Sequence, residues 1–210
     1  MATHTSQTDT EARAIAADRL IVFADAVIAI ALTLLALDLP VPSGETSGAM
    51  FESALAHGKE YLAFALSFTV IAAHWRAHHE IFRYVGSLNS RLTSLALTWL
   101  FMQVLMPFAT RVLTAEGAFA PRFSLYAIVQ VLASSLFALI IREIRGQHLS
   151  RAEVLPRVFA QSQLRSLCLA AVFAVSIPVS FLTSSTGAFA CWLAVPIVLR
   201  IALRLQARAS

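Results

Sequence analysis

Asp25 is the residue whose chemistry most needs an explanation, because it lies inside an apolar stretch long enough to form a membrane helix. A carboxylate in such a helix costs about 2.5–3.5 kcal/mol at its middle and less near an end. Arg19 precedes Asp25 by six residues, which is about 600° of helical rotation, so the two side chains do not share a face. We therefore expect each of them to find a partner on another segment.

Two histidines, His74 and His78, form a second polar group, with His79 and Glu80 beside them. Their spacing of four residues places both on one helical face, where a histidine pair can bind zinc or haem. The other histidines fall in predicted tails or loops, so no further ligands come from the membrane. We expect no bound metal and no cofactor, and metal analysis of the purified protein is the test.

The composition places these residues in a membrane protein. Hydrophobic residues make up 58% of the 210 positions and charged residues only 13%, and the mean hydropathy is +0.73. A soluble domain carries about 25% charged residues. The excess of apolar side chains must therefore face lipid, and we predict an all-α, polytopic membrane protein.

Six apolar stretches are candidates for membrane-spanning helices, each of which needs about 20 residues. The second is short and can extend backward through residues 51–58, and the sixth can extend to Leu205 if Arg200 and Arg204 reach the interface. The predicted cores are Leu20–Leu39, Tyr61–Trp75, Leu92–Thr110, Phe123–Ile141, Ser166–Thr183 and Thr186–Leu199. We expect residues 1–18 to be a cytoplasmic tail, disordered over residues 1–12, residues 19–205 to be the membrane domain, and residues 206–210 to be a cytoplasmic end.

The basic residues are unevenly distributed between the predicted loops. The net charge is +4, which by itself is compatible with nucleic-acid binding. However, only Lys59, Arg111 and Arg122 of the 16 Lys and Arg residues fall on the side opposite the termini. This asymmetry is the positive-inside pattern. It predicts cytoplasmic termini in a cell inner membrane and argues against nucleic acid as a partner.

The first predicted helix has two distinct faces. Phe23, Val27, Ile30, Leu34 and Leu37 recur at spacings of four and three residues and form one continuous aliphatic face, with Thr33 at its edge. Such a face most often contacts lipid or packs against other helices. Asp25 shares the other face with Ala29, Leu32 and Ala36, where small residues permit close helix packing. We expect the face that carries Asp25 to contact neighbouring helices.

Motifs in the first three predicted helices resemble those of a known family. The first motif follows the pattern Arg-x-x-x-Phe-Ser-Asp, except that Ala24 replaces the Ser. The second motif is similar to Trp-x-x-His followed by a Phe, the third is a single Asn, and the fourth is similar to Pro-Phe-x-Thr. They are Arg19-Leu-Ile-Val-Phe23-Ala24-Asp25, Trp75-Arg-Ala-His78-His79-Glu-Ile-Phe82, Asn89, and Pro107-Phe108-Ala109-Thr110. In this order they resemble the transmembrane protein 175 family, which comprises lysosomal potassium channels and their bacterial relatives.

The resemblance implies a homotetramer of six-helix subunits whose first helices surround a potassium-permeable pore. By position from the motif, Ile30 is the implied main constriction, Leu34 and Leu37 are further rings, and Thr33 and Asp38 line the pore. An implied structural polar network joins Arg19, Phe23, Asp25, Trp75, His78 and Asn89. The implied partners are further copies of the chain, monovalent cations and the lipid bilayer.

One other class of function stays open at this point. Asp25 and His78 can relay protons, as in a proton- or cation-coupled secondary transporter. An enzyme needs a nucleophile with its base or a phosphate-binding loop, and we find neither, so we expect no enzymatic activity. No Thr-Val-Gly-Tyr-Gly segment occurs in the sequence, which excludes a selectivity filter of that type.

Overall fold

The computed structural model describes residues 2–151 and 156–209, and the side chains of residues 15–151 and 157–206. Every regular element in this part of the chain is a helix, which confirms the all-α prediction. The helices are α1 (Ala2–Leu37), α2 (Ser47–Ala56), α3 (Gly58–Phe82), α4 (Ser90–Thr114), α5 (Phe119–Gly146), α6 (Pro156–Leu182), α7 (Ser185–Leu193) and α8 (Val195–Ala209).

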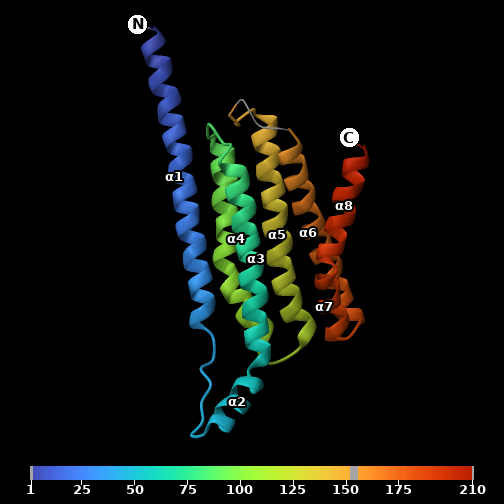
Figure 1. The fold of residues 1–210 in the computed structure, drawn as a ribbon. Coiled ribbons are helices and arrows are strands. Elements are labelled where there is room, and N and C mark those ends of the chain that lie inside the picture. Colours follow the sequence, from blue (N-terminus) through green and yellow to red (C-terminus); the bar gives the residue numbers. More distant parts are fainter. Residues whose placement is uncertain (1, 152–155, 210) are drawn as a thin grey trace.

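The long helices form one bundle and run alternately in opposite directions (Figure 1). α1 lies at one edge beside α3 and α4, α5 lies between α4 and α6, and α7 and α8 lie at the other edge. Both chain ends lie at the same end of the bundle. That arrangement is the one expected for an even number of crossings.

Five segments of the described chain are long and apolar enough to cross a membrane. They are Ile15–Leu37, Ser90–Thr114, Phe119–Gly146, Arg157–Leu182 and Ser185–Gln206. α3 has 25 residues and lies within the bundle (Figure 1), but His74, Arg76 and His78 make its second half more polar. The polytopic prediction is therefore supported, whereas the sixth span stays a prediction.

The structure corrects three predicted boundaries. The second span does not extend backward, because α2 is a separate helix without buried residues and the chain bends at His57 before α3. Residues 2–12, predicted to be disordered, are helical and belong to α1. The last span is interrupted at Ala194, between α7 and α8, next to Pro196, which lacks the N–H needed to continue the helical hydrogen bonds.

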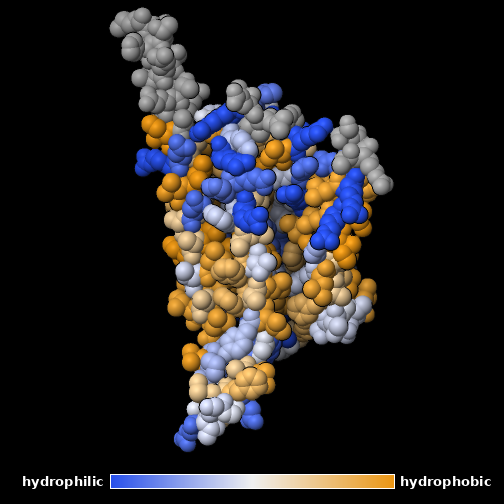
Figure 2. All heavy atoms as spheres, viewed as in Figure 1, coloured by the Kyte–Doolittle hydropathy of each residue, from blue (hydrophilic) through white to orange (hydrophobic). Residues whose placement is uncertain are grey.

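Large side chains fill the centre of the bundle around α4 and α5. Trp99, Phe123 and Tyr126 are fully buried, and Trp192 of α7 stacks on Phe123 with ring centroids 4.4 Å apart. The outer surface is also apolar, as a lipid-facing surface must be. On the face shown in Figure 2, a hydrophobic belt covers the middle of the molecule, and hydrophilic side chains gather at the end where the termini lie.

Candidate pore-lining face and polar contacts of α1

One face of α1 packs against α3 and α4. Its buried residues recur every three or four positions, as the helical period requires. They are Ala17, Leu20, Ala24, Ile28, Ala31 and Leu35. The packing face is therefore not the predicted one, because Ala29 and Ala36 are exposed. Ala24, which replaces the motif Ser, is only 1% exposed and lies where a small side chain lets two helices approach closely.

The predicted aliphatic face of α1 points away from the bundle. Phe23, Ile30, Leu34 and Leu37 are 50%, 59%, 41% and 79% exposed, and only Val27 of this face packs partly against the core. The rise of about 1.5 Å per residue places Leu34 about 6 Å and Leu37 about 10 Å beyond Ile30 along the axis. In one copy of the chain this face is free for lipid or for another subunit.

The two predicted polar lining residues lie near this face. Thr33 is exposed, and its hydroxyl donates to the carbonyl of Ile30 at 2.8 Å, which leaves the oxygen lone pairs for another contact. Asp38 follows the last residue of α1, and its carboxylate lies 3.6 Å from the guanidinium of Arg111 on α4. This pairing offsets part of the negative charge that Asp38 would bring to a pore.

Asp25 finds its partner on α3, as predicted. The indole Nε1 of Trp75 donates to Oδ1 of Asp25 at 2.9 Å. The Trp75 ring stacks on His79, with centroids 5.6 Å apart, so the orientation of the indole is supported from its own helix. The hydrogen bond joins α1 to α3 from a side of α1 that does not carry Ile30 and Leu34.

The remaining members of the predicted network do not join this pair. His78 is 1% exposed and stacks between Phe82 and Trp99, at centroid distances of 4.0 and 5.1 Å. Arg19 is exposed and forms no hydrogen bond or ion pair with the other predicted members within the described part of the chain.

Asn89 belongs to a separate cluster at the end of the bundle that holds the termini. Its side chain accepts from the backbone N–H of Leu92 at 2.6 Å, which caps α4. It also donates to Glu143 of α5 at 2.9 Å, and Glu143 lies 3.4 Å from Arg91. The sequence analysis missed Glu143, although a carboxylate at the end of an apolar stretch is a signal of the kind that marked Asp25.

A row of buried polar residues inside the bundle was also missed. Thr110 donates to Ser67 at 2.7 Å and Ser67 to Tyr126 at 3.2 Å, which links α3, α4 and α5. Further along, His74 contacts the amide of Gln103 through Nδ1 at about 3.3 Å. The pair His74 and His78 is thus engaged in packing, and no group of three candidate ligands for a metal occurs among the described residues.

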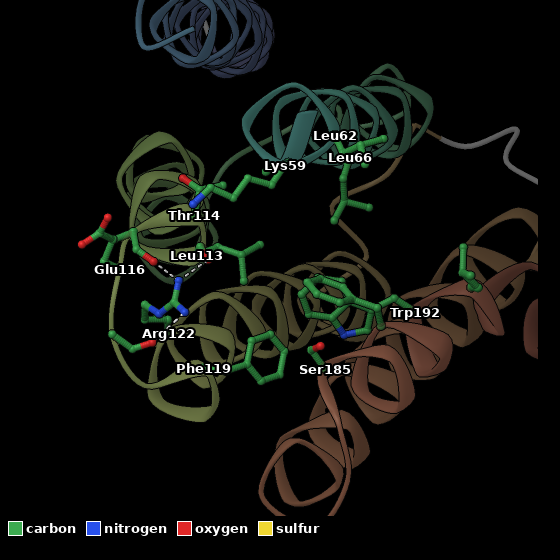
Figure 3. Close-up of a pocket in the computed structure, with 15 residues that line it drawn as sticks. Lys59, Leu62, Leu66, Leu113, Thr114, Glu116, Phe119, Arg122, Ser185 and Trp192 are labelled. Atoms are coloured by element: carbon green, nitrogen blue, oxygen red, sulfur yellow. Dashed lines mark hydrogen bonds between the residues drawn. The ribbon is translucent and has the colours of Figure 1, made fainter. Parts of the chain in front are cut away.

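A cavity of about 640 Å³ lies at the end opposite the termini, between α3, α5, α7 and the α4–α5 connection. Figure 3 shows its walls, with Leu66, Phe119 and Trp192 among them. Arg122 does not offer its charge freely here, because it donates to the carbonyls of Leu113 and Gly117 at 3.0 and 2.9 Å and also to that of Ala115. The cavity therefore suits an apolar chain.

Comparison with known proteins agrees with the motifs. The model of a family described as endosomal/lysosomal potassium channel TMEM175 matches residues 19–107, which include Asp25, Trp75 and Asn89. Over these residues the chain is similar to that family. Residues after 107 lie outside the match, and for them the likeness rests on the fold.

Curated relatives match part of the chain. Potassium channels of Streptomyces collinus and Chamaesiphon minutus are 34% and 36% identical over 118 and 114 residues. Each alignment covers 53% of this chain and 57% or 55% of the relative. The chain thus spans about half the length of the curated relatives it matches.

Solved structures of the TMEM175 family share the whole fold. The crystal structure of a lysosomal potassium-selective channel TMEM175 homolog from Chamaesiphon minutus covers 92% of this chain and 98% of its own, with a TM-score of 0.67 and 24% identity. A variant of the potassium channel MtTMEM175 in complex with a nanobody fusion gives a TM-score of 0.62 at 16% identity, over 90% and 93% of the two chains. The five candidate spans, together with the match to a channel family over residues 19–107, make the chain a multi-pass membrane protein.

Proposed function

We propose that this chain is a subunit of a homotetrameric, potassium-permeable cation channel whose pore is lined by α1. The observation that carries the proposal is the exposed aliphatic face of α1 in a chain that matches the TMEM175 family over residues 19–107. Four copies that meet through α1 enclose an axis on which Ile30, Leu34 and Leu37 form successive rings. The curated relatives, which are named as potassium channels, support the choice of ion.

Rings of aliphatic side chains control ions without binding them. They offer no oxygen ligands to replace the hydration shell, and a narrow apolar constriction dewets and blocks conduction. Stripping water from the smaller sodium ion costs more than from potassium, and this difference gives potassium its advantage. In this scheme Ile30 is the main constriction, and Thr33 offers its hydroxyl oxygen close to the ring.

The proposal also fixes an orientation in the membrane. The hydrophilic side chains gather at the end that holds both termini (Figure 2), and Lys59, Arg111 and Arg122 lie toward the other end. The positive-inside rule then makes the termini cytoplasmic in the plasma membrane. A channel of this kind needs no cofactor and carries out no enzymatic reaction.

A proton- or cation-coupled transporter is the second candidate, and the row of buried polar residues within one subunit favours it. Thr110, Ser67 and Tyr126 form a continuous hydrogen-bonded chain between helices, and a transporter needs such groups in its interior. A channel conducts with single-channel currents, whereas a transporter shows saturable flux at a fixed stoichiometry.

Potassium and sodium flux through liposomes that contain the purified protein tests the proposal. We expect potassium flux to exceed sodium flux in the wild type. Ile30→Asn places an amide in the constriction and is expected to raise sodium flux until the preference for potassium is largely lost. Ile128→Asn is the matched control, because Ile128 is also exposed, at 44%, but lies on α5 and not on α1. An unchanged ion preference in Ile30→Asn contradicts the constriction assignment.

A further inference from the structure

A second cavity, of about 310 Å³, lies between α3, α5, α6 and α8. Its volume is at the lower end of the range of small-molecule sites. It lies in the half of the bundle nearer the chain ends, and Figure 2 shows the molecule hollowed between α3 and α8, where hydrophilic side chains meet the hydrophobic belt. The cavity thus opens on the side of the bundle, toward lipid.

Buried hydroxyl groups line the inner wall of this cavity. Ser134, Ser162 and Ser166 are 2%, 5% and 6% exposed. The Ser134 hydroxyl has no hydrogen-bond partner among the described residues. A buried polar group without a partner is destabilising, because it has lost its hydrogen bonds to water without replacing them. A ligand that accepts a hydrogen bond from Ser134 removes this cost.

Two arginines line the same cavity, Arg76 on α3 and Arg165 on α6. Counted from the nearer helix ends, Phe82 and Pro156, they lie about 9 and 13 Å inside the bundle at 1.5 Å per residue. Neither arginine forms a salt bridge or a side-chain hydrogen bond within the part of the chain that the structure describes. Both arginines are exposed at the cavity, so their guanidinium groups are free to meet an anion, and among the lining residues only Glu80 is a carboxylate.

The rest of the lining is apolar. Phe137, Leu169 and Leu199 belong to it, and they come from α5, α6 and α8. The cavity therefore combines guanidinium and hydroxyl donors with a hydrophobic wall that continues into the lipid-facing surface. An amphipathic anion fits this combination better than a free ion does, because its apolar part gains the contact with the wall.

We propose that this cavity binds the phosphate-bearing headgroup of an anionic phospholipid. Arg76 and Arg165 bind the phosphate, for which the planar guanidinium is the preferred partner. Ser134 donates to the headgroup, and the acyl chains follow Leu169 and Leu199 out to the bilayer. Basic pockets between membrane helices on the cytoplasmic side bind anionic lipids in this way. The site does not depend on whether α1 lines a pore.

Native mass spectrometry of the purified full chain, titrated with phosphatidylglycerol, tests the site. Arg165→Ala and Arg76→Ala are each expected to weaken lipid binding roughly tenfold or more, because each removes charge-assisted hydrogen bonds. The matched control is Arg142→Ala, which removes an exposed arginine of α5 outside the cavity, and we expect it to bind the lipid as the wild type does. If the Arg165→Ala protein elutes as an aggregate in size-exclusion chromatography, the Arg165→Gln variant is measured in its place.

Inorganic phosphate separates a lipid headgroup from a free anion. We expect millimolar phosphate to leave bound phosphatidylglycerol in place. The lipid assignment is overturned if phosphate binds with the same dependence on Arg76 and Arg165 while phosphatidylglycerol does not bind. Equal losses of lipid binding in Arg142→Ala and Arg165→Ala overturn the site itself. They would show that the lipid is attracted by the basic residues at this end of the bundle in general.

Discussion

Asp25 shows how one polar residue can set the orientation of a membrane helix. Its carboxylate is half-buried, and the hydrogen bond from Trp75 connects α1 to α3. Inter-helix hydrogen bonds in membrane proteins contribute about 0.6 kcal/mol on average and up to about 1.7 kcal/mol. The contribution to stability is therefore modest, but a hydrogen bond is directional, so we expect it to favour one rotation of α1 against α3.

Removing either partner of this bond is expected to destabilise the subunit. We expect Trp75→Phe and Asp25→Ala each to lower the free energy of unfolding by about 1 kcal/mol, and Asp25→Ala also to reduce the yield of tetramer. A double-mutant cycle in detergent measures the coupling, which we expect to be close to the single effects because the bond is lost only once. Strictly additive effects, or a normal tetramer yield in Asp25→Ala, contradict the structural role.

At the scale of elements, α1 is held by a narrow face of small and aliphatic residues. Ala24 and Ala31 are each 1% exposed, so an added side chain at either position has no space. Ala29 lies on the same helix but is exposed. Ala24 and Ala29 are five residues apart, so the same substitution at each position tests which face of α1 packs against the neighbouring helices.

We expect Ala24→Leu to destabilise the subunit by about 1–3 kcal/mol, the usual cost of overpacking a core. Ala29→Leu makes the same chemical change on the open face and is expected to alter stability by less than about 0.5 kcal/mol. Thermal unfolding of the two variants in detergent measures the difference. The reverse order of stabilities contradicts the packing face described here.

At the scale of the whole molecule, the apolar face of α1 needs a neighbour if it lines a pore. Cysteine cross-linking reports this directly once the two native cysteines, Cys168 and Cys191, are replaced by Ser. In that background Leu34→Cys is expected to form disulfide-linked dimers rapidly on mild oxidation, because copies of Leu34 meet around the axis. Non-reducing gel electrophoresis of the membrane fraction is the measurement.

The control for cross-linking is Leu132→Cys on α5, a leucine that is also exposed, at 45%. We expect it to stay monomeric, because α5 does not surround the proposed axis. Dimers of Leu132→Cys with none of Leu34→Cys place α1 against lipid. That result ends the case for conduction along α1.

The sequence by itself determined the helical class, the membrane environment, the exposed face of α1 and the contact between Asp25 and another segment. These follow from local rules, since hydropathy, helical period and the cost of a carboxylate in lipid act along one segment. The position of the packing face was not determined in this way. Ala24 and Ala29 are chemically identical, and only the neighbouring helices decide which of them is buried.

Only the tertiary structure decided how the polar residues divide among sites. The motifs suggested one network, but Asn89 bonds to Glu143, which is 54 positions away, and His78 stacks on Trp99 instead of joining Asp25. The same holds for the cavity that brings Arg76 and Arg165 together from α3 and α6. Contacts between distant segments depend on how whole helices pack, and this packing minimises the free energy of all their faces together.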